Sequence, residues 1–359
     1  MNFYFIFFNL MFVQLIMYGL TIWFMHIDNT SHYTNENNNI SKNVNISCNH
    51  SYGKGGIMIV ADEGAQESYK NAIRSMKCYG LKHGYPVLVV GPETASAECN
   101  SMNDFMFKRH CMILNELSNY DWLAVFDGDV GIVNADKCLE SLLKPEIDVV
   151  HEERFHNGEV QAGNYIIKNN VFGRRYLRKW MEYDKDLTSS FHNSDNGALH
   201  IHLLKEIAGN KTAIIDKCYN MWKLSNNLDT YDQFVGCVMD YVTHYDRQND
   251  GPKNIRLVRR GHGFVRDLWV TKNDVVSPID FFVHAIKNHV NFYDVSKESE
   301  DNCGSVNYNP ILLSNKMINI SNMMKIMATA DLAAYSDRPK SILQNALIGY
   351  CWPNCKSYW

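Results

Sequence analysis

The chain has 359 residues, enough for one large α/β domain with an appendage and for a substantial hydrophobic core. It carries 35 basic and 39 acidic residues, and no block of lysine and arginine offers a surface for nucleic acid. We therefore expect a single catalytic or binding domain and no nucleic-acid partner.

The first 27 residues contain no Asp, Glu, Lys or Arg and are rich in Phe, Leu, Ile and Met, so this stretch is long and apolar enough to cross a bilayer as a helix. A cleaved signal peptide usually shows a basic start, a shorter apolar core and a small-residue cleavage site, and none of these is clear. The pattern favours an uncleaved signal-anchor helix over residues 1–27.

Residues 28–54 form a polar, Asn-rich stretch that is typical of an exposed stem. Four N-x-[ST] glycosylation triplets begin there, at Asn29, Asn39, Asn45 and Asn49, and Asn210 and Asn319 begin two more. The cluster indicates a lumenal stem. We therefore predict a single-pass type II protein of the Golgi or endoplasmic reticulum membrane, attached through its N-terminal helix.

The ten cysteines fit that compartment, because disulfides persist in the secretory pathway. Cys351 and Cys355 flank Trp-Pro-Asn and are candidates to hold the C-terminal tail. Their pairing stays open. A zinc site is the competing interpretation, but the cysteines show no repeated CxxC spacing.

A strand–helix–strand unit opens the predicted catalytic part. An apolar strand over 57–62 is followed by helical spacing over 67–83 and a second apolar strand over 87–91. Short connections predict a right-handed parallel crossover, which places Asp62 at the ligand-binding edge. Asp62 is a candidate to contact the base or ribose of a nucleotide, and a helix cap is the equal alternative.

A second helix, over about 104–117, carries Lys108, Arg109 and His110. One of these side chains is expected to face phosphate, and Arg109 is the candidate. A solvated helix face is the alternative.

An apolar strand over 123–126 then delivers Asp127 and Asp129 around Gly128. Two carboxylates at a strand end, with a glycine that lets the backbone turn closely, suit a hard divalent cation that also binds diphosphate. A second pair, Asp184 and Asp186, lies in a charged helical stretch. Only the first pair follows a buried strand, so we assign the metal to it.

Three segments carry a resemblance to a known family: FMFKRHCMILNELSNYDWLAVFDGDVGIVN, ERFHNGEVQAGNYIIKN and SFHNSDNGALHIHLL. In this order, over roughly residues 56–290, they resemble an uncharacterised nematode-type nucleotide-diphospho-sugar transferase family. That family is similar to plant galactosyl- and xylosyltransferases of the GT-A fold. The resemblance implies an α/β fold with a Rossmann-type mixed sheet flanked by helices, and a glycosyltransferase that uses Mn²⁺ or Mg²⁺.

The resemblance also implies the metal ligands. The two acids of the GT-A D-x-D motif correspond to Asp127 and Asp129, and a late histidine commonly adds a third ligand. We choose His284, which follows an apolar strand, over His262, which lies in a glycine-rich segment. Lys287 has the spacing of a diphosphate contact.

Two further segments match positions near the donor sugar. Gly163 and Asn164 resemble the small-residue turn beneath that sugar, with an ordinary β-turn as the alternative. Asp195 and Asn196 begin the predicted helix 197–207, where related enzymes place an acid or amide near the reacting sugar. Asp195 is equally a candidate helix cap. It would stabilise the sugar cation in a retaining enzyme or serve as the base in an inverting one.

These expectations give a catalytic domain over 55–293 and a C-terminal extension over 294–359. The predicted activity is sugar transfer from a nucleotide-diphosphate sugar, with a UDP-sugar favoured, to a glycan or glycoprotein acceptor. A haloacid-dehalogenase-type phosphohydrolase would need Thr or Val where Gly131 stands. The main alternative is a non-catalytic GT-A-like protein that binds glycans or nucleotide sugars.

Overall fold

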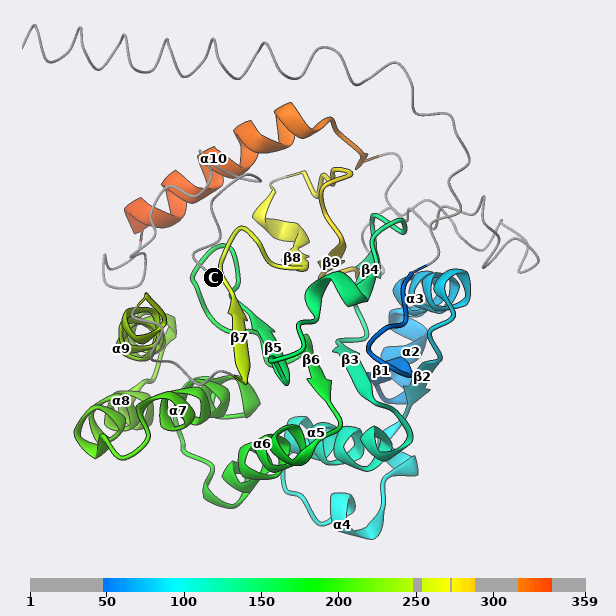
Figure 1. Cartoon of the computed structure of the whole chain (residues 1–359). Coiled ribbons are helices and arrows are strands. Elements are labelled where there is room, and N and C mark those ends of the chain that lie inside the picture. The colour runs from blue at the N-terminus through cyan, green and yellow to red at the C-terminus, as the bar shows by residue number, and fades with distance from the viewer. Residues whose placement is uncertain (1–47, 248–253, 272, 288–315, 338–359) are drawn as a thin grey trace, which may run out of the picture. The chain divides into compact units, whose positions relative to one another are not determined.

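The structure is a computed structural model that describes residues 48–247, 254–271, 273–287 and 316–337 (Figure 1). The predicted anchor and Cys351 and Cys355 lie outside these residues, as does the stem before residue 48. Within the described ranges, no helix combines the length and apolar character needed to cross a membrane. The sequon asparagines Asn49, Asn210 and Asn319 are all exposed.

The main sheet has six strands in the order β2-β1-β3-β6-β5-β7 (Figure 1). In chain order they are β1 (Gly55–Val60), β2 (Val87–Val90), β3 (Trp122–Phe126), β5 (Val149–Glu152), β6 (Tyr165–Lys168) and β7 (Ile255–Val258).

The pairing of these strands makes the sheet mixed. β1 lies parallel to both β2 and β3, as the predicted crossover requires, so the carboxyl ends of all three meet at one edge. β6 runs antiparallel to β3 and β5, and β5 is parallel to β7. An α/β fold with a mixed sheet flanked by helices is therefore confirmed.

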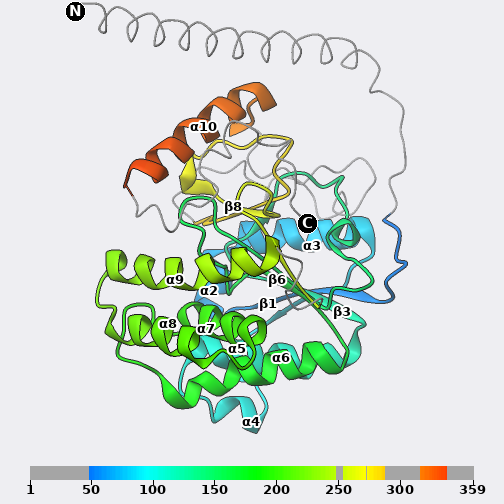
Figure 2. The same cartoon turned by 60° about the vertical axis from the view of Figure 1, so that its left-hand side comes forward.

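Side chains of β3 alternate between the two faces of this sheet. The strand is entirely buried because helices cover both faces. Leu123 and Val125 pack toward α5 (Phe105–Glu116) and α6 (Val171–Met181). Trp122, Ala124 and Phe126 pack toward α3 (Lys70–His83). Figures 1 and 2 show these helices on opposite sides of the sheet.

The helix expected over 67–83 corresponds to α3, which begins three residues later, and a short helix, α2 (Glu63–Ser68), precedes it. Asp62 caps α2, because its Oδ1 accepts a hydrogen bond from the Ala65 backbone nitrogen at 2.8 Å. The chain leaves helical geometry at Tyr69, which separates the two helices.

Three helices follow α6 and pack against one another: α7 (Asp195–Ala208), α8 (Thr212–Leu224) and α9 (Leu228–Arg247). A disulfide between Cys218 and Cys237 joins α8 to α9. A second one, Cys99–Cys111, joins α4 (Ala97–Asn100) to α5. These bridges fasten the helical layer beneath the sheet.

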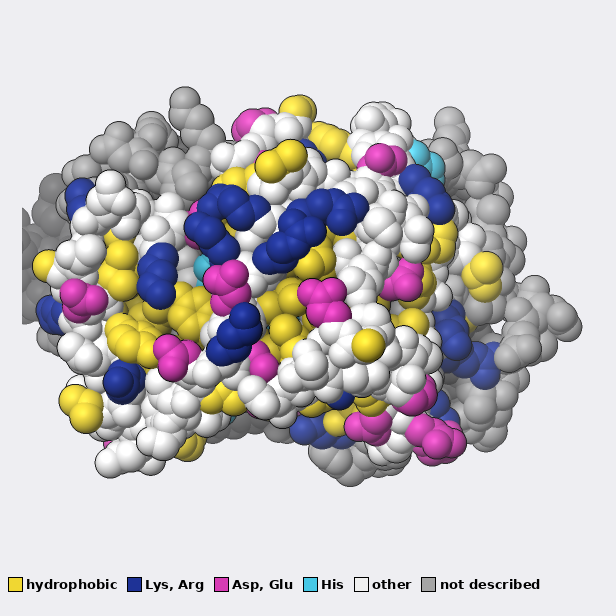
Figure 3. All heavy atoms as spheres, turned by 90° about the horizontal axis from the view of Figure 1, so that it is seen from below, with side chains coloured by type: hydrophobic (Ala, Val, Ile, Leu, Met, Phe, Trp, Pro, Cys, Tyr) yellow, Lys and Arg dark blue, Asp and Glu magenta, His cyan; other side chains and the backbone are white. Residues whose placement is uncertain are grey.

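The surface of that helical layer mixes basic and acidic side chains over exposed apolar ones, as the view from below shows (Figure 3). Arg175 and Lys179 of α6 both pair with Glu206 of α7. This face thus carries both signs of charge, as in an ordinary solvated surface.

A small second sheet lies beside the carboxyl end of β3, in the order β4-β9-β8. It contains β4 (Gly131–Ile132), β8 (Val265–Asp267) and β9 (Phe282–His284), with β8 parallel to β9. The helix α10 (Ile320–Asp337) covers this region, where Met323 and Met327 pack against Phe155 (Figures 1 and 2).

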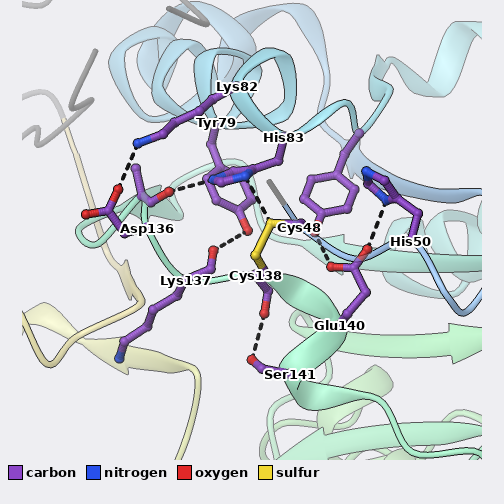
Figure 4. Close-up of a disulfide and its surroundings, with 12 residues drawn as sticks. Cys48, His50, Tyr79, Lys82, His83, Asp136, Lys137, Cys138, Glu140 and Ser141 are labelled. Atoms are coloured by element: carbon purple, nitrogen blue, oxygen red, sulfur yellow. Dashed lines mark hydrogen bonds and ion pairs between the residues drawn. A yellow bond between two sulfur atoms is a disulfide. The ribbon is translucent and has the colours of Figure 1, made fainter. Parts of the chain in front are cut away.

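A third disulfide, Cys48–Cys138, ties the segment before β1 to the loop after β4 (Figure 4). His83 of α3 lies against it, with Nδ1 at 2.9 Å from the Cys48 sulfur and Nε2 at 2.6 Å from the Ala135 carbonyl oxygen. Cys48, His83 and Cys138 are close enough to resemble a metal site. Because the two sulfurs are bonded to each other, neither is a thiolate ligand.

Candidate metal centre

Asp127 and Asp129 lie immediately after β3, at the edge where the parallel strands end. The backbone turns here, with the Val130 nitrogen donating to the Asp127 carbonyl oxygen at 3.2 Å. A Cβ at Gly128 would lie 3.1 Å from the Tyr69 ring and 3.5 Å from the Ala61 Cβ, so a side chain at this position would crowd the turn. The two carboxylates therefore stay on one short, tightly packed loop.

His284 ends β9 and faces both acids. Its Nε2 lies 3.2 Å from Asp129 Oδ1 and 3.8 Å from Asp127 Oδ2. After it the chain reverses, with Ala285 at φ +72° and the Ile286 nitrogen donating to the Asp129 carbonyl oxygen at 2.9 Å. This backbone bond fixes β9 directly to the aspartate loop.

One ligand atom from each of Asp127, Asp129 and His284 lies within 4.8 Å of the others. Two carboxylates suit Mg²⁺ or Mn²⁺, and an imidazole adds a nitrogen donor that transition metals accept. The three residues therefore fit a divalent cation, and Mn²⁺ fits this mixed set well.

Asp267 of β8 holds the other side of the His284 ring, with Oδ1 at 2.7 Å from Nδ1. It also accepts from Arg154 Nη1 at 2.5 Å. Metal-binding histidines usually make such a second bond, which fixes the ring orientation. Asp267 thus leaves Nε2 of His284 directed at Asp127 and Asp129.

The charges around His284 change its pKa. Burial lowers this pKa, but hydrogen bonds with Asp129 and Asp267 outweigh burial and raise it to about 10. The imidazole is therefore doubly protonated and lies between two carboxylates. A cation bound by Asp127, Asp129 and His284 would replace the Nε2 proton that points toward Asp129.

Arg109, from α5, connects the aspartate loop to the start of α7. Its Nη1 donates to Asp127 Oδ1, and its Nη2 donates to Asp195 Oδ2 at 2.7 Å. The guanidinium is buried. Because Arg109 occupies Oδ1 of Asp127, Oδ2 is the oxygen left facing His284.

Asp195 is buried at the start of α7 and has a second hydrogen-bonding partner, His110 Nε2, at 3.1 Å. His110 stacks on Trp180 with ring centroids 3.8 Å apart, and its Nδ1 lies 2.9 Å from the Tyr165 hydroxyl. Burial raises the pKa of Asp195, but the Arg109 charge and the His110 hydrogen bond lower it to about 2. The carboxylate is therefore a stable anion.

The turn that precedes β6 lies directly against Asp127. A Cβ at Gly163 would lie 1.8 Å from Asp127 Oδ2, so no larger residue fits. Asn164 is buried and its Oδ1 accepts from the Asp127 nitrogen at 3.2 Å. Asn196 Oδ1 accepts from the Ala162 nitrogen at 3.0 Å, which fastens the turn to α7.

Three predicted residues lie at the margin or elsewhere. Asp62 is exposed and caps α2. Lys287 is exposed. Burial raises the pKa of Asp129, the hydrogen bond and charge of His284 lower it, and the charge of Lys287 lowers it further. His262 lines a separate pocket with Arg266 and Asp280, and is not part of the metal-type cluster.

Sequence reasoning missed Asp267 and Tyr69. Burial raises the pKa of Tyr69, and the charges of Asp129, Asp127 and Asp62 raise it further, which places this ring beside the aspartate loop. The register of β8 on β9, which pairs Asp267 with His284, is a long-range feature without a local sequence signal. Tyr69 carries no local signal either.

Comparisons with known proteins identify a family and distant structural likenesses. A family model described as "Protein of unknown function, DUF273" matches residues 76–298. No curated protein matches the sequence. A solved structure titled "Crystal structure of a glycosyltransferase involved in the glycosylation of the major capsid of PBCV-1" is 14% identical, with a TM-score of 0.35. That match covers 64% of this chain and 92% of the other.

Proposed function

The chain belongs to the DUF273 family of proteins of unknown function, and we propose that it is a metal-dependent glycosyltransferase. The observation that carries the proposal is the convergence of Asp127, Asp129 and His284 at the carboxyl edge of the main sheet. In α/β sheets of this kind, ligands bind at that edge. The donor we propose is a nucleotide-diphosphate sugar, with a UDP-sugar favoured, and the acceptor is a glycan or glycoprotein.

In this proposal Asp127, Asp129 and His284 hold Mn²⁺ or Mg²⁺. The cation, when bound, neutralises charge on the departing diphosphate. Lys287 supplies a nearby positive charge at the exposed end of the same segment. Arg109 keeps Asp127 in place through Oδ1 and leaves Oδ2 for the ligand side.

Asp195 has a role that its surroundings restrict. A carboxylate with a pKa of about 2, held by Arg109 and His110, is a weak general base near neutral pH. The low pKa favours a role for the Asp195 carboxylate in stabilising positive charge on the reacting sugar, as a retaining mechanism needs. Asn196 acts indirectly, because it fastens the turn that carries Gly163 and Asn164.

The proposed location is the secretory pathway, with a type II anchor over 1–27 and the catalytic domain in the lumen. The exposed sequon at Asn49, next to a disulfide-bonded cysteine, supports this location. The alternative function is a binding protein that recognises glycans or nucleotide sugars without turnover.

The test is nucleotide release from a panel of nucleotide sugars by the purified full-length chain, with Mn²⁺ or with a chelator. We expect metal-dependent release with one donor. Replacing a residue that orients a metal ligand commonly reduces metal affinity or activity by about 10- to 100-fold, and loss of a ligand itself costs more. Asp127→Asn is therefore expected to reduce nucleotide release by more than about 100-fold.

The matched control is Asp186→Asn, which alters an exposed aspartate of the second aspartate pair, outside the cluster. It is expected to keep the wild-type rate. A folded protein that binds none of the donors would overturn the enzyme proposal and leave the binding protein.

A further inference from the structure

Trp269 is exposed in a setting where its ring is held in place. It belongs to the short 3₁₀ helix Leu268–Val270 that follows β8, and 49% of it is accessible to solvent. Among the large apolar side chains that the described residues leave exposed, Trp269 is the only aromatic one. A tryptophan ring of this kind is a frequent anchor in binding sites, because it offers a large apolar face.

His156 braces this ring from one side. The two ring centroids are 4.3 Å apart and the rings meet edge to face at 67°. His156 Nδ1 also lies 3.8 Å from Asp267 Oδ2. His156 thus restrains the indole and is itself restrained by Asp267. Because the indole is already ordered, a ligand loses less free energy in fixing it on binding.

The pair is connected to the candidate metal centre through a single residue. Asp267 contacts His156 through Oδ2 and His284 through Oδ1, at 2.7 Å in the latter case. Trp269 follows Asp267 by two residues. The exposed ring therefore lies beside the metal centre, on the side of His284 that faces β8.

A second aromatic ring lies against the aspartate loop. Tyr69 is at the ends of the parallel strands, where a Cβ at Gly128 would lie 3.1 Å from its ring. That is the edge where a nucleotide is expected in a sheet of this type. Trp269 lies beyond Asp267, in the 3₁₀ helix that follows β8, which leaves it for the other substrate.

We infer that Trp269, braced by His156, forms the acceptor subsite and binds the apolar face of an acceptor sugar ring. A pyranose offers carbon-bound hydrogens on its face and hydroxyl groups at its edge, so it matches an exposed indole bordered by polar side chains. The partly exposed imidazole of His156 is such a polar neighbour, since it lies against the Trp269 ring. This inference rests on the proposed function, because it assigns the second substrate of the same site.

The experiment measures acceptor and donor KM for the full-length chain with Mn²⁺ and the active nucleotide sugar. The acceptor probes are methyl glycosides of galactose, glucose, xylose, mannose and N-acetylglucosamine. We expect Trp269→Ala to raise the acceptor KM by about tenfold or more relative to the donor KM. Trp269→Phe keeps a flat ring and is expected to recover most of that loss.

The matched control is Leu224→Ala, which truncates an exposed apolar side chain at the end of α8 and is expected to leave both KM values unchanged. An equal acceptor KM in wild type and Trp269→Ala would overturn the inference. A rise in donor KM alone would place the nucleotide base on Trp269 and would also overturn it.

A second measurement separates this inference from the proposed function. Binding of the full-length chain to a glycan array needs no turnover. If no donor is hydrolysed, glycan binding that disappears in Trp269→Ala still supports a sugar subsite at this ring. Glycan binding that survives in Trp269→Ala, or a complete absence of glycan binding, contradicts the subsite.

Discussion

At the scale of single residues, the candidate centre depends on side chains that restrain other side chains. Asp267 holds Nδ1 of His284, and Arg109 holds one oxygen of Asp127. Each bond leaves one defined atom, Nε2 or Oδ2, for a cation. Such partners matter for function because they fix the orientation of the ligand before it binds metal.

We predict that Asp267→Asn weakens Mn²⁺ binding by about 10- to 100-fold, because the His284 ring loses its charged partner. Isothermal titration of the folded variant with Mn²⁺ checks this. Asp280→Asn is the matched control, since Asp280 makes a buried pair with Arg266 in the same region without contacting the three ligands. Equal affinity in the two variants would remove Asp267 from this role.

The sequence predicted these residues unevenly. Asp127 and Asp129 follow a buried apolar strand, and His284 follows another, so a local pattern marks all three. Arg109 was expected to face phosphate, whereas its guanidinium contacts Asp127 and Asp195. The charge of a helical arginine is visible in a sequence, but its partners depend on how the helices pack.

At the scale of secondary structure elements, two disulfides reinforce the helices that support the centre. The Cys218–Cys237 bridge joins α8 and α9, which pack on α7, the helix that begins at Asp195. The position of Asp195 thus depends on a layer of helices held together partly by covalent bonds.

We predict that replacing Cys218 and Cys237 together by alanine lowers the free energy of unfolding by about 3 kcal/mol. A bridge across 19 residues restricts the unfolded chain by roughly this amount. Denaturant unfolding monitored by circular dichroism measures the change. Leu224→Ala, on the exposed side of α8, is expected to change stability by no more than about 0.5 kcal/mol. Equal stability of wild type and the double variant would contradict the prediction.

Elements with strong periodicity were predicted well. The strands at 87–90 and 122–126 and the helices at 105–116 and 195–208 occur close to their expected bounds. Short elements were not. β8 has three residues, too few for periodicity, and its pairing with β9 joins parts of the chain that no local pattern connects. The residues of the proposed acceptor subsite could therefore be recognised only from the structure.

At the scale of the whole molecule, several histidines are buried in the core, among them His151 on β5 and His202 on α7. Burial lowers the pKa of His151 to about 3, and that of His202 to about 3. The neutral forms are compatible with the core, whereas the unfolded chain binds protons at these groups near pH 6.5.

We predict that stability falls as the pH decreases from about 6.5 toward 3. The unfolded state binds more protons in this window, so each of His151 and His202 lowers the free energy of unfolding by up to about 1.4 kcal/mol per pH unit. His284 acts in the opposite sense in the metal-free protein, because its raised pKa gives stability that is lost as the pH rises from 6.5 through about 10. Stability is therefore expected to be greatest near pH 6.5.

Denaturant titrations at a series of pH values measure this profile. The variant His202→Gln removes one of the buried titrating groups. Its free energy of unfolding is expected to fall less steeply than that of the wild type as the pH decreases below 6.5. A variant whose stability falls as steeply with acid as the wild type would show that His202 is not responsible.

The Cys48–Cys138 disulfide determines how the domain stays attached to the segment that precedes it. Residues 49–54 are exposed or partly exposed and are open to a protease. A single cut there does not release the domain, because residue 48 remains bonded to Cys138 across a closed loop of the chain. Separation of the domain from residues 1–47 by one cut therefore requires a cleavage site before residue 48, and a cut within residues 49–54 also requires a reductant.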